Sequence, residues 1–225
     1  MRTDVHNPSP PDPVPEKRSV SAAESPAAVA QSSSAADGDS TAPADVSAAD
    51  PPTLGGVLVF TSPGIPMIFQ GQEFLEDGWF VDTDTLDWQK LDRFRGIHLL
   101  YQDLVHLRRD LRGVTGGLRG PHVAVHHTNH AEKLIAYHRW RNGGPRDDVI
   151  VLANFADRGW DGYVIGFPRP GEWKVRLNSD WEGYSDAFGN HPSHTVHADG
   201  PPADGMPCSG RVGVGAYTAI LLSQD

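Results

Sequence analysis

DVIVLANF, residues 148–155, indicates the fold class of this chain of 225 residues. Five apolar residues, Val149 to Ala153, stand in a row between Asp148 and Asn154. A short, uninterrupted apolar run that is rich in β-branched residues predicts a buried strand. Such a strand needs partners, so the sequence around it shows which kind of sheet to expect.

Strand-like segments lie on both sides of this run, at residues 122–126, 134–140, 160–167, 171–177 and 213–222. An Asn129-His130 turn joins the first two and predicts a hairpin. The last segment is expected to be one strand with a bulge at its glycines. Short strands at this spacing indicate an antiparallel sandwich or barrel, and this all-β module is expected to span residues 120–225.

One clear helix precedes the strands. Its apolar side chains recur at spacings of three and four, at Leu91, Phe94, Ile97, Tyr101, Leu104, Leu107 and Leu111. This stripe is typical of an amphipathic helix that faces a core. Gly113 is the expected stop, because glycine readily takes the left-handed conformation that ends many helices.

The residues before that helix are harder to assign. Residues 53–60 fit either the end of a buried helix or a strand. Pro63 and Pro66 bracket a tight connection, and Met67–Phe69 then predicts a very short apolar strand. An apolar run without polar alternation suits a parallel strand covered on both faces.

Composition limits the remaining possibilities. Residues 1–52 contain no Phe, Trp, Tyr, Leu or Ile, so they cannot bury enough apolar surface to offset chain entropy and are expected to be disordered. A net charge of −10 argues against nucleic-acid and anionic-membrane partners. The sequence has no apolar stretch long enough to span a membrane, and the single cysteine, Cys208, fits a cytoplasmic protein.

Residues 64–74, GIPMIFQGQEF, resemble the eighth barrel strand of the α-amylase superfamily, specifically of 1,4-α-glucan branching enzymes. The resemblance covers residues 53–225 and is strengthened by further segments in the order of that family. These segments are LDW at 86–88, the amphipathic helix, VIVLANF at 149–155, GEWKVRLNSD at 171–180 and AYTAILL at 216–222.

The resemblance implies a three-part chain. Residues 1–52 are the disordered leader, and residues 53–115 are the remnant of a (β/α)8 barrel. Within this remnant, residues 53–62 would be a helix, 66–70 the eighth strand and 91–111 its following helix. The all-β antiparallel sandwich of residues 120–225 then corresponds to the C-terminal domain of the family.

The resemblance also implies a reaction, the transfer of α-1,4-linked glucan segments to α-1,6 positions. Retaining glycosyl transfer needs a carboxylate nucleophile and a carboxylic acid. In the family these come from earlier barrel strands, which would precede Thr53, so the resemblance assigns no catalytic residue to this chain. It is therefore expected to be a fragment that is inactive alone, with an α-glucan as its partner and no cofactor.

Four residues at the end of the expected barrel strand and in the loop after it are the candidates for binding glucan: Gln70, Gln72, Glu73 and Trp79. Trp79 and Phe80 either stack on a sugar or pack the loop against the sandwich. Two alternatives remain. The chain is a stand-alone glucan-binding module that uses Trp140, Trp160, Trp173 and Trp181, or it is the C-terminal subunit of a split enzyme completed by the missing part of the barrel.

Other reactive side chains predict no site. Glu73 with a loop acid such as Asp82, Asp84 or Asp87 cannot replace a pair held rigidly by several strand ends. The histidines at 126, 127, 130, 191, 194 and 197 lack ligand spacing for a metal, and Cys208 is expected in a Gly/Pro-rich loop without an activating partner. Because neighbouring barrel strands are absent, residues 53–70 are expected to be poorly held, whereas the helix packs on the β module.

Overall fold

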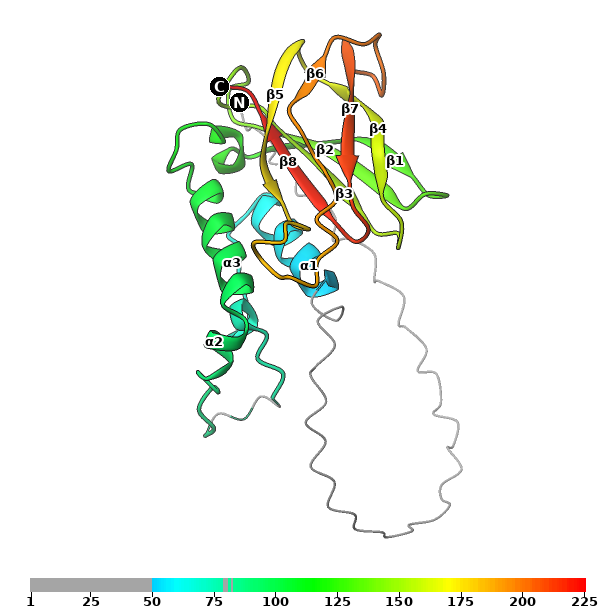
Figure 1. Ribbon diagram of the computed structural model, residues 1–225. Coiled ribbons are helices and arrows are strands. Elements are labelled where there is room, and N and C mark those ends of the chain that lie inside the picture. Colours follow the sequence, from blue (N-terminus) through cyan, green and yellow to red (C-terminus); the bar gives the residue numbers. More distant parts are fainter. Residues whose placement is uncertain (1–49, 79–80, 82) are drawn as a thin grey trace, which may run out of the picture. The chain divides into compact units, whose positions relative to one another are not determined.

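The computed structural model describes residues 50–78, 81 and 83–225. Of the predicted disordered segment 1–52, residues 1–49 lie outside the described residues, whereas residues 50–52 begin a helix and so contradict the prediction. Six strands form one sheet in the order β1-β2-β3-β8-β5-β6, and β4 and β7 form a second sheet. All of the pairings are antiparallel, so the predicted antiparallel β-sandwich is confirmed (Figure 1).

The strands are β1 (His122–Asn129), β2 (Leu134–Trp140), β3 (Val149–Asn154), β4 (Trp160–Phe167), β5 (Gly171–Asn178), β6 (Val196–Ala198), β7 (Cys208–Val214) and β8 (Ala219–Ser223). The α-helices are α1 (Asp50–Thr61), α2 (Lys90–Arg93) and α3 (Arg95–Arg108), and two 3-10 turns are η2 (Gln72–Phe74) and η3 (Gly116–Arg119). No helix in the described part of the chain is long and apolar enough to cross a membrane.

The apolar residues of strand β3, Val149 to Ala153, are all buried because the six-stranded sheet is covered on both faces. Val149, Val151 and Ala153 belong to the apolar cluster shared with the helices. Ile150 and Leu152 belong to the cluster that fills the space between the two sheets. Each fully buried side chain of this size contributes about 1.5–3 kcal/mol relative to exposure. The apolar run Val149–Ala153 thus lies in a central strand with two buried faces.

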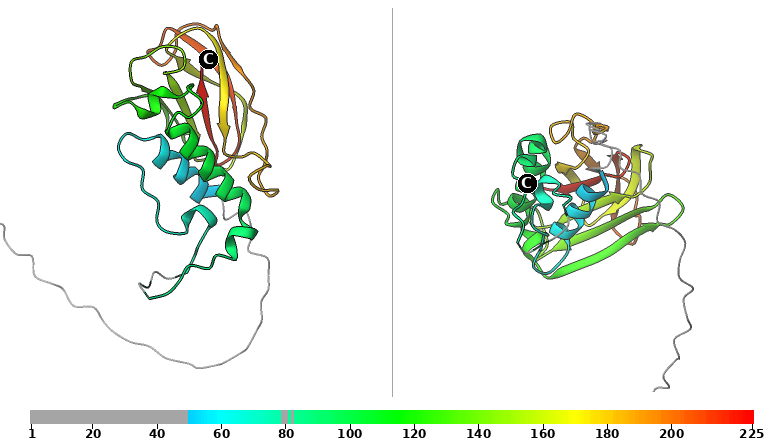
Figure 2. Two further views of the ribbon diagram at one scale, coloured as in Figure 1. Left: turned by 90° about the vertical axis from the view of Figure 1, so that its left-hand side faces the viewer. Right: turned by 90° about the horizontal axis from the view of Figure 1, so that it is seen from below.

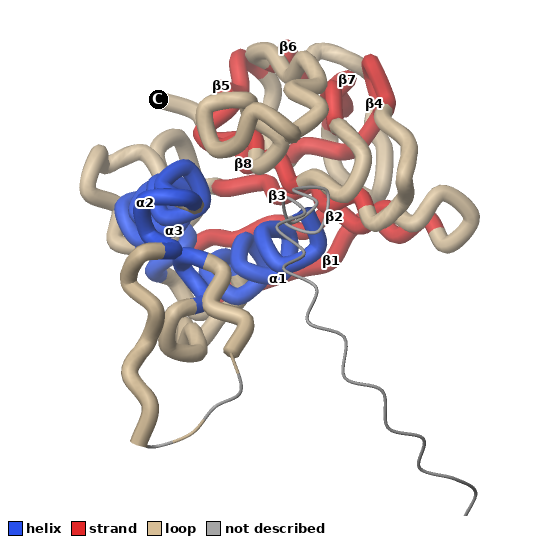
Figure 3. The backbone as a smooth tube through the Cα atoms, turned by 60° about the horizontal axis from the view of Figure 1, so that its bottom comes forward, coloured by secondary structure: helices blue, strands red, loops and turns tan. Residues whose placement is uncertain are grey.

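Helices α1 and α3 form the layer on the outer face of the six-stranded sheet, as Figures 1, 2 and 3 show. The side chains of Leu54 and Val57 on α1 and of Leu100 and Leu104 on α3 are at most 3% exposed and share one cluster with the sheet. The expectation that residues 53–70 are poorly held is therefore wrong for residues 53–61, which lie in this packed helix. The stripe on α3 does not lack a core, because α1 and the sheet supply it.

Both helical boundaries differ from the predicted ones. Helix α1 starts at Asp50 rather than Thr53, with Pro51 and Pro52 in its first turn. Proline is tolerated there because the N–H groups of the first turn have no intrahelical partner. The predicted helix 91–111 is broken at Phe94 (φ −108°, ψ 33°) into α2 and α3.

Helix α3 ends at Arg108, before the predicted stop at Gly113. The Thr115 hydroxyl donates to the Leu107 carbonyl at 2.8 Å, and the Asp110 carboxylate accepts the Thr115 N–H at 2.8 Å. These side-chain hydrogen bonds end the helix before the chain reaches Gly113. Leu111 consequently leaves the stripe and is 54% exposed.

The last predicted strand, 213–222, is two strands in the structure. The chain leaves the small sheet at Val214, turns through residues 215–218, and enters the large sheet at Ala219. The end of β7 and the start of β8 are both apolar, so hydrophobicity alone hides the change of sheet. Cys208 begins β7 and is buried, with its thiol donating to the Phe167 carbonyl at 3.3 Å, so its predicted place in a loop is wrong. Burial raises the pKa of this thiol.

Residues 66–70 form no strand in the structure, contrary to the prediction. Ile65 is 96% exposed and Met67 is 84% exposed. A β-strand requires a hydrogen-bonded neighbour, and none of the strand pairings in the described part of the chain includes these residues. The segment therefore remains an extended connection between α1 and η2.

The fully buried guanidinium of Arg139 on β2 joins the helical layer to the sheet. It donates to the carbonyls of Thr61 at the end of α1, Leu118 and Gly120 around η3, and His122 on β1. A cation at the C-terminus of a helix also faces the negative end of the helix dipole. Burial, and then the charge of Arg108, lower the pKa of Arg139.

Replacing this side chain tests how far the layers depend on it. We expect Arg139→Met to lower the free energy of unfolding by about 3 kcal/mol or more, because buried carbonyls lose a charged donor. Urea denaturation measures the change. Arg108→Met is the matched control: Arg108 also donates to carbonyls at the end of α1, but this side chain is only partly buried, so its loss should be smaller. Equal losses would contradict the central role of Arg139.

Hydrogen exchange tests the different exposure of residues 50–61 and 65–68. We expect the amides of Val57 and Phe60 to exchange slowly, as those of β3 do, because they lie in a packed helix. The amides of Ile65 and Met67 should exchange orders of magnitude faster. Comparable protection in the two segments would show that residues 65–68 are paired in solution.

Candidate functional site

The candidate site lies in the connection between α1 and α3, residues 62–90, which holds all four residues predicted to bind glucan. Its first turn is made by Gly71, whose φ of 81° suits glycine. A Cβ atom at this position would lie 2.4 Å from the Cβ of Glu76. The Gly71 carbonyl accepts the N–H groups of Phe74 and Glu76, at 3.1 and 2.9 Å, so the chain reverses tightly here.

Phe74 anchors this turn to the helical layer. Its side chain is fully buried, and its ring contacts the ring of Trp88 with centroids 5.2 Å apart. Trp88 itself is 61% exposed. The two rings hold the start and the end of the acidic loop together.

The carboxylate of Glu76 organises the loop. One oxygen accepts hydrogen bonds from the Lys90 ammonium at 2.6 Å and the Gly78 N–H at 2.9 Å. The other oxygen accepts the Asp87 N–H at 2.9 Å. The Lys90 hydrogen bond, followed by the two backbone N–H groups, lowers the pKa of Glu76 to about 2. Lys90 also pairs with Asp77, and this pair lowers the pKa of the Asp77 carboxyl.

An open cavity of about 240 Å³ lies beside this loop. Its lining includes Phe69, Gln70, Glu76, Asp84, Leu86 and Asp87. The lining combines an aromatic ring with carboxylate and amide groups. Side chains of these types can hydrogen-bond hydroxyl groups and cover an apolar face, which is what a neutral sugar presents.

The structure separates the predicted glucan-binding residues. Gln70 lines the cavity. The side-chain oxygen of Gln72 accepts the Phe69 N–H at 3.1 Å and so shapes the backbone. Glu73 lies near Tyr101 of α3: burial, and then the Glu73 carboxylate, raise the pKa of Tyr101 to about 12. Trp79, like Phe80 and Asp82, lies outside the described residues.

Glu76 and Lys90 are the residues that sequence reasoning did not single out. They are fourteen positions apart, and no helical or strand periodicity brings them together. The only signal in the sequence is that the one lysine in the loop region follows an excess of acidic residues. Without the turn at Gly71, nothing indicates which carboxylate the lysine contacts.

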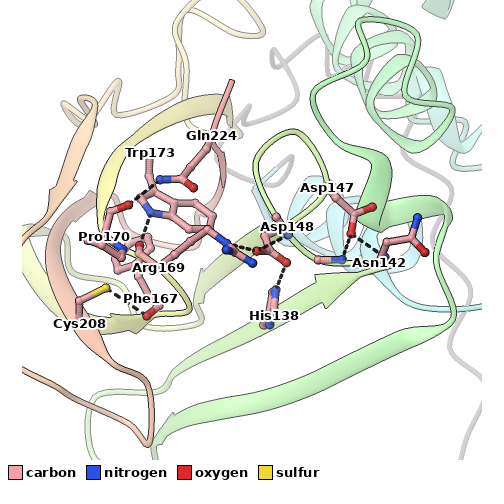
Figure 4. Close-up of polar contacts among 12 residues, drawn as sticks. His138, Asn142, Asp147, Asp148, Phe167, Arg169, Pro170, Trp173, Cys208 and Gln224 are labelled. Carbon is pink, nitrogen blue, oxygen red and sulfur yellow. Dashed lines mark hydrogen bonds and ion pairs between the residues drawn. The ribbon is translucent and has the colours of Figure 1, made fainter.

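A second polar cluster, shown in Figure 4, surrounds Asp148 in the β module. The carboxylate, 1% exposed, accepts hydrogen bonds from His138 at 2.9 Å, Arg169 at 2.8 Å and the Gly144 N–H at 2.9 Å. Burial alone would raise the pKa of Asp148, but these hydrogen bonds outweigh it and lower the pKa. Because the carboxylate is fully engaged, the cluster joins the β2–β3 and β4–β5 connections and leaves no base for chemistry.

Two of the candidate histidines take structural positions of the same kind. His127 lies 2.9 Å from the Asp204 carboxylate and 2.8 Å from the Tyr163 hydroxyl. His191 bonds to the Trp160 carbonyl at 3.0 Å. Within the described ranges, no group of three or more His, Cys, Asp or Glu side chains is placed to hold a metal ion.

With this geometry established, comparison with known proteins identifies the β module. Residues 125–225 match the family model described as alpha amylase, C-terminal all-beta domain. This part of the chain belongs to that family. The alpha-amylase-type C-terminal domain inferred from the sequence is thereby confirmed.

The curated relatives extend the match beyond this domain. The 1,4-alpha-glucan branching enzyme GlgB of Frankia casuarinae is 31% identical over 73% of this chain and 21% of its own length. The GlgB protein of Cupriavidus necator is 32% identical over 75% of this chain and 23% of its own length. The GlgB protein of Rhodococcus jostii is 29% identical over 74% of this chain and 24% of its own length. The chain thus spans about a fifth to a quarter of the length of these relatives, and its predicted branching-enzyme-like character is confirmed at the level of the family.

A solved structure shows the same fold. The debranching enzyme from Nostoc punctiforme superposes with a TM-score of 0.53 over 77% of this chain and 30% of its own, at 16% sequence identity. The likeness reaches beyond the alpha-amylase-type C-terminal domain, because that domain is less than half of the chain. At this identity it describes the fold alone.

The Glu76–Lys90 pair gives the loop a defined pH dependence. The lowered pKa of Glu76 means that its contribution to loop order is complete above its ordinary pKa of 4.5 and is lost as the pH falls towards about 2. We expect Lys90→Met to move this pKa back towards 4.5, which carboxyl-carbon NMR titration measures. Asp77→Asn is the control, because it leaves the Glu76–Lys90 hydrogen bond in place. A Glu76 pKa unchanged by Lys90→Met would contradict the pairing.

Proposed function

We propose that this chain is the C-terminal part of a branching-type enzyme of α-glucan metabolism. In such an enzyme, α-1,4-linked segments of a glycogen- or starch-like polymer are transferred to α-1,6 positions. Residues 53–115 would be the last helix-strand-helix of its catalytic barrel, and residues 120–225 the domain packed beside it. The 225-residue chain alone would not catalyse the transfer.

The single observation that carries the proposal is the exposed apolar segment between α1 and α3. Ile65, Met67 and Phe69 are 96%, 84% and 60% exposed, although both flanking helices are packed. Arg108 donates to the carbonyls of Ser62 and Gly64 and holds the start of the segment. An apolar segment that is held at its start and exposes three of its apolar side chains is suited to receive neighbouring strands, as the eighth strand of a barrel does.

The acidic loop supports the same conclusion. A general acid for glycosyl transfer needs a raised pKa so that it is protonated when the bond breaks. Glu76, the best-ordered carboxylate beside the cavity, has a lowered pKa and is held by Lys90. It can position a loop but cannot donate the proton. The catalytic carboxyl groups would then come from barrel strands other than the one described here.

In this proposal the cavity beside the loop is the edge of a glucan-binding cleft. Gln70 would bind glucan hydroxyl groups, and Trp79 would stack on a sugar ring. Gln72 would maintain the backbone at Phe69, and Glu73 would act as a nearby acceptor at the strand end. The single cysteine, buried and unpaired, supports a cytoplasmic location.

A stand-alone glucan-binding module is the second candidate, and one observation favours it. Of the four tryptophans predicted as platforms, Trp181 is 45% exposed, whereas Trp173 is fully buried. Trp140 is stacked against His122 and His138, with ring centroids 5.2 and 4.5 Å apart. One accessible platform would support binding without catalysis.

A chimeric enzyme tests the first proposal. Residues 53–225 of this chain would replace the corresponding C-terminal part of the Frankia casuarinae relative. We expect the chimera to form α-1,6 linkages in amylose, measured by NMR of the product, because the segment at residues 65–69 completes the barrel. The 225-residue chain alone should form none.

Two controls make the result decisive. A chimera carrying Met67→Asp should fold less well and lose most activity, because a charge would enter the strand position. A chimera that is folded, binds glucan and yet forms no linkage would contradict the proposal. Branching by the 225-residue chain alone would contradict the assignment of the catalytic groups to other strands.

A further inference from the structure

The loop that follows β5, residues 179–195, packs against α3 and carries the exposed ring of Trp181. The Tyr184 hydroxyl donates to the Asp103 carboxylate on α3 at 2.7 Å, and Tyr184 and Phe188 are buried in the cluster shared by the helices and the sheet. A Cβ atom on Gly96 of α3 would lie 2.0 Å from the Tyr184 carbonyl, so the two backbones are in direct contact. The loop is therefore held firmly against the helix.

The base of this loop is also fixed. The buried carboxylate of Asp180 accepts the N–H groups of Gly189 and His191 at 2.6 and 2.8 Å. The Tyr184 N–H bonds to the Trp181 carbonyl at 2.9 Å and forms a turn. The Trp181 ring meets the Tyr184 ring edge-on, with centroids 5.0 Å apart and an interplanar angle of 86°. A rigid loop that presents an exposed indole is pre-organised for binding.

An open cavity of about 730 Å³ lies between this loop and the two helices. Gly183 lines it from the loop, and a Cβ atom there would lie 2.4 Å from the Trp181 ring, so the indole packs against a residue of the cavity wall. Leu91 and Leu99 provide apolar lining from α2 and α3. The volume is within the range of about 300–1,000 Å³ that is usual for ligand sites.

The polar lining has free hydrogen-bonding capacity. Asp92, Arg95 and Gln102 face the cavity. In the part of the chain that the structure describes, the side chains of Asp92 and Arg95 make no hydrogen bond or ion pair. The Gln102 amide bonds to His98 through one nitrogen at 3.0 Å, which leaves its oxygen available as an acceptor.

This combination suits a neutral polyhydroxyl ligand. An indole face packs on the C–H face of a pyranose ring, and carboxylate, guanidinium and amide groups bind its hydroxyl groups in pairs. The opposite charges of Asp92 and Arg95 cancel within the cavity. The net charge of −10 on the chain disfavours an anionic ligand.

We propose that Trp181, with Asp92, Arg95 and Gln102, forms an α-glucan-binding site between the β5–β6 loop and α3, separate from the cavity at Gln70. The choice of an α-glucan rests on the proposed function, whereas the position of the site rests on this geometry. The site would hold a segment of a long glucan on the helical side of the molecule.

The experiment measures the binding of maltoheptaose to the complete chain by isothermal titration calorimetry and by the shift of the Trp181 indole N–H signal in NMR. We expect Trp181→Ala to weaken binding at least tenfold, Trp181→Phe to weaken it a few-fold, and Gln102→Ala to weaken it without unfolding the loop. Phe155→Ala is the matched control, since Phe155 is 41% exposed but lines a different cavity, and it should bind normally.

Each contrary outcome has one meaning. If Trp181→Ala and Gln102→Ala bind as well as the unaltered chain, the site is elsewhere and the proposed function is unaffected. If the unaltered chain binds no maltoheptaose, this site is refuted, while the branching assay of the chimera still tests the proposed function independently. Equal affinity for cellohexaose would overturn the assignment of an α-linked ligand.

Discussion

The hydrogen bonds of the buried Arg139 guanidinium are the interaction on which the arrangement of layers depends. One side chain on β2 reaches carbonyls at the end of α1, around η3 and on β1. Apart from that of His122 on β1, these carbonyls belong to elements that no sheet pairing connects to β2, and buried carbonyls are costly to leave without donors. A charged, branched donor satisfies several of them at once, which lysine could not do in the same geometry.

This constraint explains why the helical layer is ordered. With the end of α1 fixed on β2, its apolar side chains lie over the sheet, and α3 packs beside them in the same cluster. Thr61 adds a second connection, because its hydroxyl contacts the Tyr137 hydroxyl on β2. In the connection at residues 65–69, the side chains of Ile65, Met67 and Phe69 remain exposed, whereas Ile68 packs against the core and both flanking helices belong to it.

The two cavities proposed to bind glucan lie on this helical layer. The cavity at Gln70 depends on the tight turn at Gly71 and on Glu76, whose low pKa keeps its charge for Lys90. The cavity at Trp181 depends on a loop of the β module that packs on α3. The cavity at Gln70 is proposed to be the edge of a glucan-binding cleft. The cavity at Trp181 is proposed to hold a segment of a long glucan. Both uses need the helices to be fixed on the β module.

The sequence by itself determined the β-sandwich, the main helix and the likeness to branching enzymes, because apolar runs, their periodicity and short motifs are local properties of the chain. The all-apolar run Val149–Ala153 was recognisable as a buried strand. Its two-sided burial, the change of sheet after Val214, and the pairing of Glu76 with Lys90 were decided only by the tertiary structure. The expected strand at 66–70 failed for the same reason, since a strand exists only where neighbours supply its hydrogen bonds. Side-chain partners far apart in sequence have no local signal, and they are what fixes the helical layer and both cavities.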